Sequence, residues 1–332
     1  MAPGVPICDA RRGYPGRISE PVIADAVAVP AGVSAAVLAR AEAAYLGLAL
    51  GDALGATVEF MTPREIAHHY GVHREIVGGG WLKLRPGHIT DDTGMALALG
   101  AAILASRGKV EPLACAQAFD AWMRSKPPDI GNTVRRNLVL FRRTACPEAP
   151  PSEHDAGNGA AMRVLPVALA TLGQAETAVR GACRAQAHVT HHNALSDAAC
   201  EFLVLAVQDF LLGKSLREVF RQRIQPLVQA NPAFAFRGRS RRENPSGWVV
   251  ETLQAVLQGL VDTGAFESCL IDVVNRGGDA DTTGAIAGML GGALYGREAL
   301  PARWIKALDP AVRDACIAQA RALVFASRPS AR

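Results

Sequence analysis

The segment Gly277-Gly278-Asp279-Ala280-Asp281-Thr282-Thr283-Gly284 decides the fold, because it joins a carboxylate-rich turn to a segment of small, apolar residues. Gly288, Gly292 and Gly296 continue from Gly284 at intervals of four residues. This interval places the glycines on one face of a helix. A face without side chains allows a second helix backbone to approach closely. The sequence therefore predicts a tightly packed helix over residues 283–295.

The same spacing recurs in two other segments, at Gly47, Gly51 and Gly55 and at Gly94, Ala98 and Ala102. The first segment ends shortly before Glu59, and the second follows the acidic run Thr90-Asp91-Asp92-Thr93. Any single stripe is best explained by ordinary helix packing in an alanine-rich protein. Three stripes beside three acidic motifs favour a different interpretation. We expect the three helices to pack closely and to bring the acidic side chains together.

The two acidic clusters offer only carboxylate and hydroxyl oxygens, which are ligands of hard divalent cations such as Mg²⁺ or Mn²⁺. Either cluster alone is explained by helix capping, since acidic residues stabilise helix N-termini. Five or more converging acids would be costly without a cation, because like charges at short range resist joint ionisation. An EF-hand is excluded, since the twelfth position from Asp279 is Leu290 and not an acid. We predict one metal site built from both ends of the chain, and hence a metal-dependent enzyme.

The composition is that of a folded protein, because 49% of the 332 residues are hydrophobic and only 20% are charged. The net charge of +4 is too small and too dispersed to indicate a nucleic-acid partner, although it is compatible with an anionic substrate. Seven cysteines without a CxxC pair indicate reduced thiols in a cytoplasmic protein. The longest apolar stretches, 95–105 and 285–295, are too short to span a membrane.

Helical periodicity begins at Ser34, and strand-like alternation is nearly absent, so we predict one all-α domain over residues 34–328. Residues 1–33 contain five prolines and are predicted to form a partly disordered extension. The other predicted helices cover 35–53, 63–70, 92–106, 111–125, 131–141, 160–170, 174–187, 196–212, 215–229, 249–263, 266–275 and 310–326.

Three further motifs have ordinary explanations when each is taken alone. Gly157-Asn158-Gly159 is a glycine-rich turn that opens a predicted helix, where free amides bind phosphate, although such a turn is more often only a turn. The run from Asp129 to Thr133 indicates a loop and a helix cap. Thr190-His191-His192 lies between two predicted helices, where a solvated or capping histidine is the common case.

Taken in order, these motifs resemble the ADP-ribosylglycohydrolases, and among them the dinitrogenase reductase-activating glycohydrolases of nitrogen-fixing bacteria. The resemblance spans residues 44–296 and is highly specific as an ordered set. It is carried by Gly51-Asp52-Ala53-Leu54-Gly55 with Glu59-Phe60, Thr90-Asp91-Asp92-Thr93, Gly157-Asn158-Gly159 with Met162-Arg163, Thr190-His191, Ser246-Gly247-Trp248-Val249 and Gly278-Asp279-Ala280-Asp281-Thr282-Thr283-Gly284.

The resemblance implies an orthogonally packed all-α fold around two divalent metal ions, Mn²⁺ or Mg²⁺. It implies a set of metal ligands comprising Thr90, Asp91, Asp92, Asp279, Asp281 and Thr282. Glu59 corresponds to the acid that binds or gates the metal pair, and Asp92 belongs with Glu59 and Asp129 to the catalytic set. The implied substrate contacts are Asp129 and Asn132 at the distal ribose, Gly157, Asn158 and Gly159 at the diphosphate, and His191 in the cleft. Trp248 departs from the family, which commonly has tyrosine there beside the adenosine; a tryptophan still stacks on a ring but lacks the phenol hydroxyl.

The implied activity is hydrolytic removal of ADP-ribose from a modified protein, most simply from an arginine of the nitrogenase iron protein, which reactivates that protein. A carboxylate, either Glu59 or Asp129, then moves the proton, and spacing does not decide between them. A PII-type signalling protein is an expected regulator, and peripheral membrane association is compatible with the sequence. Two alternatives stay open: a hydrolase for serine-linked or other ADP-ribose conjugates, and a non-catalytic ADP-ribose-binding protein.

Overall fold

The computed structural model describes residues 34–327, and over these residues it contains helices and no named strand. The predicted extension, 1–33, lies outside the described residues. The all-α fold class is confirmed. The α-helices are α1 (Ala35–Gly55), α2 (Pro63–Tyr70), α3 (Asp91–Ala105), α4 (Pro112–Arg124), α5 (Asn132–Thr144), α6 (Leu165–Ala170), α7 (Glu176–Ala187), α8 (Ala194–Leu211), α9 (Leu216–Val219), α10 (Gln225–Ala230), α11 (Val249–Asp262), α12 (Phe266–Val274), α13 (Ala280–Tyr295), α14 (Ala302–Ala307) and α15 (Pro310–Ala326).

Helices α1 and α13 form the centre of the molecule, and their backbones are in direct contact through glycine. A Cβ added to Gly51 would lie only 1.9 Å from the carbonyl oxygen of Gly284. In the same way Gly47 meets Gly288 at one end, and Gly55 meets Ala280 at the other. Because the numbering rises in one helix as it falls in the other, the two helices are antiparallel. The predicted packing of these two glycine stripes is confirmed.

The third stripe does not join this glycine contact, although α3 itself contacts both α1 and α13. Gly94 of α3 faces α4, where an added Cβ would lie 2.8 Å from Nε1 of Trp122. Further along α3, Gly100 faces α15 instead, and an added Cβ there would meet the side chain of Gln319. The large side chains of Trp122 and Gln319 fill the space beside these two glycines, so neither glycine contacts a helix backbone as Gly51 does.

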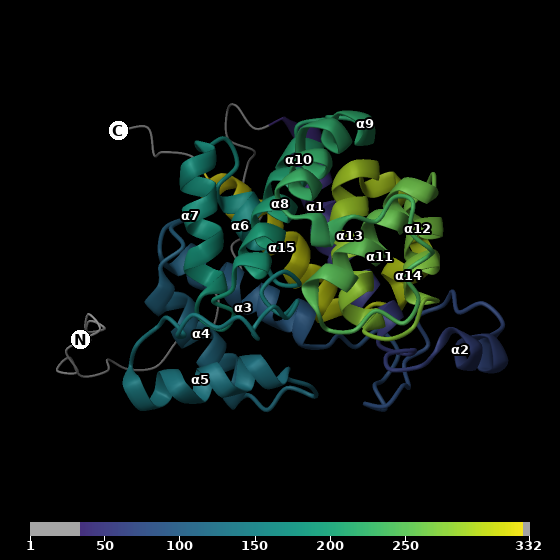
Figure 1. The fold of residues 1–332 in the computed structure, drawn as a ribbon, viewed down its shortest axis with the longest axis horizontal. Coiled ribbons are helices and arrows are strands. Elements are labelled where there is room, and N and C mark those ends of the chain that lie inside the picture. The colour runs from purple at the N-terminus through teal and green to yellow at the C-terminus, as the bar shows by residue number, and fades with distance from the viewer. Residues whose placement is uncertain (1–33, 328–332) are drawn as a thin grey trace.

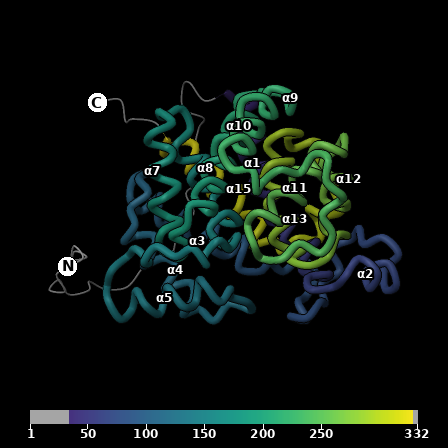
Figure 2. Tube along the Cα trace, viewed as in Figure 1, coloured from purple at the N-terminus to yellow at the C-terminus, as the bar shows by residue number. Residues whose placement is uncertain are grey.

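The remaining helices surround the α1–α13 pair (Figure 1). Helices α8, α11 and α12 contact α13, whereas α15 packs along α1 and also touches α3 and α6. Helices α4, α5 and α7 lie together at one side, and α2 projects at the opposite corner (Figure 2). The acidic starts of α3 and α13 lie close together, although they are far apart in the sequence.

Several predicted helix boundaries shift by a few residues, and two predicted helices differ more clearly from the structure, in both cases near a proline. The helix predicted from residue 160 begins at Leu165, because Pro166 lacks an amide hydrogen and is tolerated in a first turn. The helix predicted over 215–229 contains a π-helical turn at Phe220–Ile224, in which the amide of Gln225 donates to the carbonyl of Phe220. This wider turn precedes Pro226, which cannot donate to the residue four positions earlier.

The short helix α14 is absent from the sequence-based prediction, since six residues give too little periodicity. The six cysteines within residues 34–327 are all unpaired, as the prediction of reduced thiols requires, and Cys8 lies outside the described residues. No helix in the described part of the chain combines the length and apolarity needed to cross a membrane.

Replacing Gly51 with alanine tests the central helix contact. Because the new methyl group would overlap the backbone of α13, we expect Gly51→Ala to lower the free energy of unfolding by at least about 3 kcal/mol. The matched control is Gly181→Ala on α7, where no atom lies within 4 Å of an added Cβ. Alanine favours helix over glycine by about 1 kcal/mol, so this control should be neutral or stabilising. Equal urea midpoints for the two variants would contradict the proposed role of the contact.

Candidate active site

The second acidic cluster is presented by a tight turn that only glycine can form. Gly277 and Gly278 have φ angles of +71° and +65°, a conformation that L-residues with side chains rarely adopt. An added Cβ would lie 2.1 Å from the carbonyl oxygen of Met61 at Gly277, and 2.2 Å from that of Pro245 at Gly278. The turn therefore packs tightly between the loops that contain Met61 and Pro245, and it places Asp279 at the N-terminus of α13.

The first acidic cluster is fixed by Asp52 of α1, whose buried carboxylate accepts four hydrogen bonds. The amide nitrogens of Thr90 and Thr93 donate to it over 2.9 and 3.1 Å, and their hydroxyls donate over 3.0 and 2.6 Å. Thr90 itself, the residue preceding α3, makes no side-chain capping bond, and neither does Asp279 before α13. Asp52 therefore caps α3. The side chains of Asp91 and Asp92 are not needed as caps of this helix.

Asp52 was not assigned a role by sequence reasoning, although the motif Gly51-Asp52-Ala53-Leu54-Gly55 was singled out. The signal in the sequence is a carboxylate in the last turn of a largely apolar helix, because a buried carboxylate needs several donors to be stable. Burial raises the pKa of Asp52 to about 6, against the opposing effect of its hydrogen bonds from Thr93 and Thr90. The side chain links the end of α1 to the start of α3.

The acids from the two clusters meet at one centre. Carboxylate oxygens of Glu59, Asp279 and Asp281 all lie within 4.8 Å of one another. Asp92 adjoins the same group, since the hydroxyl of Thr282 is 3.4 Å from its Oδ2 atom. Asp91 is turned toward the loop that carries Asp129, where its Oδ2 atom accepts from the amide of Gly131 over 3.3 Å. Glu59, the acid after α1, thus belongs to the tightest carboxylate group in residues 34–327.

Among the residues that the structure describes, no basic side chain forms an ion pair with the carboxylates of this centre. Burial raises the pKa of Glu59 to about 8, although a hydrogen bond from Trp81 opposes this, and the charge of Asp279 adds to it. Burial and the charge of Asp129 raise the pKa of Asp91 to about 7. The pKa values of Asp92 and Asp281 are also well above normal, first because of burial and then because of neighbouring carboxylates.

Two observations fit the centre to a divalent cation. Within residues 34–327, none of the carboxylates of Asp52, Glu59, Asp91, Asp92, Asp279 and Asp281 forms an ion pair with a lysine, arginine or histidine. The Oδ1 atom of Asp92 is buried and has no hydrogen-bond partner among the described residues. An unpartnered buried carboxylate oxygen is costly, and a hard cation would satisfy it. The donor set is therefore that of a buried acidic cluster able to bind a divalent metal.

A cleft of about 520 Å³ opens above this centre, and most of the predicted site residues line it. Those lining residues are Glu59, Asp91, Asp129, Asn132, Gly157, Asn158, Gly159, His191, Asp279, Asp281 and Thr282. Thr90 and Asp92 do not line the cleft and are buried next to residues that do, with 2% and 1% of their surfaces exposed. The tertiary structure therefore gathers predicted site residues from six separate parts of the chain around one volume.

The turn at Gly157, Asn158 and Gly159 connects the cleft wall to the acidic centre. The side-chain amide of Asn158 donates to Oδ2 of Asp279 over 2.6 Å and to the hydroxyl of Thr252 over 2.9 Å. The turn does not open a helix, because α6 begins only at Leu165, so the expected helix N-terminus is absent from this position. Any anion here would contact the turn itself and not a helix dipole.

His191 packs against this turn so closely that it leaves little room for a side chain at Gly157 or Gly159. A Cβ added to Gly157 or Gly159 would lie 3.0 Å from Nε2 or 2.8 Å from Cε1 of the imidazole. Burial and the charges of Arg163 and Arg136 lower the pKa of His191 to about 3. The ring is therefore neutral at physiological pH, and it is a buried member of the cleft wall and not the solvated or capping histidine that is common at such positions.

Arg163 holds His191 in place through Thr190. The guanidinium donates to the hydroxyl of Thr190 over 2.8 Å, and that hydroxyl lies 2.8 Å from Nδ1 of His191. Because arginine can only donate, the hydroxyl is free to donate its own proton to Nδ1, which leaves Nε2 protonated and facing the turn. Arg163 also bonds to Gln186 and stacks on the ring of Phe119. The Met162-Arg163 motif is therefore a structural support of the cleft.

Trp248 lies beside the cleft and is not among its lining residues. Its backbone pairs with Gly157, and 43% of its surface is exposed. Its predicted contact with adenosine stays a prediction.

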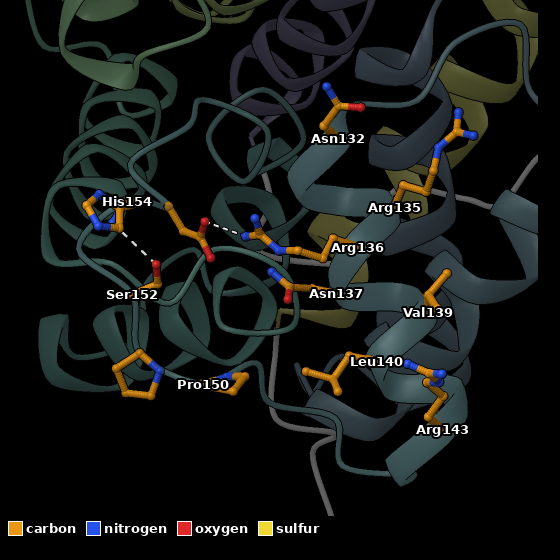
Figure 3. A pocket seen from close by; sticks show the side chains of 12 residues that line it. Asn132, Arg135, Arg136, Asn137, Val139, Leu140, Arg143, Pro150, Ser152 and His154 are labelled. Carbon is orange, nitrogen blue, oxygen red and sulfur yellow. Dashed lines mark hydrogen bonds and ion pairs between the residues drawn. The ribbon is translucent and has the colours of Figure 1, made fainter.

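A second hollow of about 730 Å³ lies between α5 and the loop of residues 150–155 (Figure 3). Figure 3 shows Arg136 directed across it toward an ion pair with Asp155. Asn132 lines both hollows, but no carboxylate of the acidic centre reaches the second one. The larger hollow is therefore a neighbour of the candidate active site and not the site itself.

A sequence profile of the family described as ADP-ribosylglycohydrolase matches residues 33–330. The chain belongs to the ADP-ribosylglycohydrolase family. The predicted resemblance is thus confirmed, and the cleft with its buried acidic centre is the candidate active site of a member of this family.

Relatives within the family extend over most of the chain. The chain is 48% identical over 285 residues to the ADP-ribosyl-[dinitrogen reductase] glycohydrolase of Rhodospirillum rubrum, which covers 86% of this chain and 95% of that protein. It is 31% identical to the ADP-ribosylarginine hydrolase Tri1 of Serratia proteamaculans (strain 568), over 82% of this chain and 75% of that one. A solved structure described as an ADP-ribosylglycohydrolase-related protein complex matches with a TM-score of 0.78 at 34% identity, covering 88% of this chain and 99% of that chain.

Replacing Asp52 tests its role as the cap of α3. Asp52→Ala leaves both amides and the Thr93 hydroxyl without an acceptor, whereas the Thr90 hydroxyl can still donate to Asp92, and we expect the free energy of unfolding to fall by about 2–4 kcal/mol. The control is Glu42→Ala on the same helix, which removes an ion pair with the exposed Arg321 and should cost less than about 1 kcal/mol. Urea unfolding measures both variants, and a cost for Asp52→Ala no larger than the control's would refute the capping role.

Adding a divalent cation tests the acidic centre. Because the ion binds the folded chain and relieves repulsion between carboxylates, Mn²⁺ or Mg²⁺ should raise the Tm by several degrees over the chelated protein. A ligand at about one hundred times its Kd adds about 2.7 kcal/mol to the free energy of unfolding. Asp281→Asn should abolish the shift, whereas Asp314→Asn, at an exposed position on α15, should retain it. An equal shift in both variants would place the ion elsewhere.

Proposed function

We propose that this chain is a divalent-metal-dependent hydrolase that removes ADP-ribose from a modified protein by cleaving the N-glycosidic bond to an arginine side chain. The observation that carries the proposal is the buried acidic centre beneath the cleft, in which one carboxylate oxygen of Asp92 has no partner among the described residues. Membership of the ADP-ribosylglycohydrolase family supports the reaction class.

The protein target that we propose is the nitrogenase iron protein. The support is the relative from Rhodospirillum rubrum, whose name specifies ADP-ribosyl-[dinitrogen reductase] and which matches nearly its whole length. The Tri1 relative, named an ADP-ribosylarginine hydrolase, supports arginine as the attachment residue. A PII-type regulator, peripheral membrane association and a cytoplasmic location stay predictions from the sequence.

We assign two ions, Mn²⁺ or Mg²⁺, to the acidic centre. The residues that would hold them are Thr90, Asp91, Asp92, Asp279, Asp281 and Thr282, with Glu59 beside them. When bound, the ions supply Lewis-acid polarisation of ribose hydroxyls and lower the pKa of a coordinated water.

The chain's own residues bind the substrate around this centre. Asp129 and Asn132 hold the distal ribose from one side of the cleft, and the turn at Gly157–Gly159 contacts the diphosphate. The protonated Nε2 of His191 faces that turn and can donate to the substrate. The buried floor excludes bulk water from the bond to be cut, which strengthens each of these polar contacts.

Glu59 and Asp129 are the two carboxylates available for proton transfer. Both line the cleft, so either can accept a proton from the attacking water while the other donates one to the leaving nitrogen. The pH profiles of Glu59→Gln and Asp129→Asn distinguish them, because loss of the base removes the acidic limb and loss of the acid removes the basic limb. A non-catalytic role is disfavoured by the retention of every acid that the family motif contains.

Removing either half of the acidic centre should abolish the reaction. We expect Asp92→Ala and Asp281→Ala to lower Mn²⁺-dependent release of ADP-ribose from an ADP-ribosyl-arginine peptide at least about 100-fold, in the range seen when an electrostatic catalytic group is lost. Circular dichroism checks that folding is retained, and Asp314→Ala serves as a surface control. Full activity of either variant in chelator would exclude the metal-dependent mechanism. Release only from an ADP-ribosyl-serine peptide would exclude the arginine linkage.

A further inference from the structure

Two large aromatic side chains stand exposed at the mouth of the cleft. Phe60 lines the cleft with 65% of its surface exposed, and Trp81 is 50% exposed. Their ring centroids are 5.4 Å apart with an interplanar angle of 47°. We call this pair the aromatic platform. Burying such rings would stabilise the fold. Their exposure beside the acidic centre therefore indicates a surface that binds a ligand.

The platform is fixed in place by contacts with the acidic centre. Nε1 of Trp81 donates to Oε2 of Glu59 over 2.6 Å. The amide of Phe60 donates to the carbonyl of Gly278 over 2.7 Å, directly before Asp279. Phe60 has a φ of +62°, a conformation that residues with side chains rarely adopt and that here turns its ring outward. The ring of Phe60 is therefore presented to the cleft, and Trp81 is held next to it through Glu59, which also lines the cleft.

The segment that carries Trp81 is itself held against the end of α1. The backbones of Gly79 and Leu84 exchange two hydrogen bonds of 2.8 and 2.9 Å. Gly80 packs so closely on the carbonyl of Ala56 that an added Cβ would lie 2.3 Å from its oxygen. The indole thus has a defined position relative to Glu59.

The platform and the cleft together favour a planar cation. Glu59, Asp129 and Asp279 line the cleft, and no lysine or arginine is among its described lining residues. Aromatic faces attract cations through their negative quadrupole, and the flat guanidinium group stacks on them especially well. A hydroxyl-derived leaving group is neutral and gains nothing from either feature.

We propose that the aromatic platform binds the guanidinium group of the modified arginine, and that Phe60 and Trp81 select arginine-linked over serine-linked ADP-ribose. The proposal rests on the proposed function, since it concerns the leaving group of that reaction. Phe60 acts through its face alone. Trp81 supplies a second face and, through its N–H group, positions the carboxylate of Glu59.

Two substitutions separate the two roles. Phe60→Leu keeps an apolar side chain but removes the aromatic face, so kcat/KM for an ADP-ribosyl-arginine peptide should fall roughly 3- to 30-fold, the range of one cation–π contact. Activity on an ADP-ribosyl-serine peptide should change less than twofold. Trp81→Phe keeps a face but loses the N–H donor, so it should lower both activities equally and leave their ratio unchanged. Tyr70→Leu, an exposed aromatic on α2 that does not line the cleft, is the control.

A binding measurement keeps this inference separate from the reaction. With Mg²⁺ and free ADP-ribose bound, calorimetry compares methylguanidinium with its neutral analogue methylurea. The wild-type chain should bind methylguanidinium more tightly, and Phe60→Leu should lose that preference while Tyr70→Leu keeps it. If Phe60→Leu binds both compounds as the wild type does, or lowers both peptide activities equally, the platform is not a guanidinium site. If the wild type releases no ADP-ribose from either peptide yet shows the preference, the proposed function fails and the cation site remains.

Discussion

The contact between the glycine faces of α1 and α13 is the constraint on which the site depends. Gly47, Gly51 and Gly55 allow the two backbones to touch, and the helices run antiparallel. The end of α1 therefore meets the start of α13, and Glu59 comes beside Asp279 and Asp281. A bulkier residue at these positions would separate the helices and also the carboxylates, so packing and function share the same cause.

A second link, through Asp52, adds the other half of the acidic centre. Its four hydrogen bonds fix the start of α3 to α1, and Asp91 and Asp92 follow from there. The centre is assembled at a cost to stability, because its carboxylates are buried and their pKa values are raised by burial and mutual repulsion. Energetically costly arrangements of this kind are typical of functional sites, and a bound cation would offset the repulsion between the carboxylates.

The sequence alone predicted most of the helices, the packing of two of the three glycine stripes and the convergence of the acids, because periodicity and spacing are local properties. It failed where a distant neighbour decides the outcome. Gly94 has the same spacing as Gly51, but only the fold places Trp122 opposite it. The π-helical turn before Pro226 and the late start of α6 depend on how one proline is accommodated. The resemblance supplied the roles that we propose for Asp129, Asn132 and His191, which composition and spacing do not indicate.

The sequence by itself determined which functional groups are present. These are oxygen ligands at two helix starts, helix faces lined by glycine, and an ordered set of motifs typical of one family. Only the tertiary structure decided how these parts act together. It made Asp52 a cap and not a ligand, turned Arg163 into the support of His191, and left Oδ1 of Asp92 without a partner among the described residues. It also set Trp81 against Glu59. The reason is physical, since hydrogen bonds, burial and charge repulsion depend on distances through space, which residue spacing along the chain does not specify.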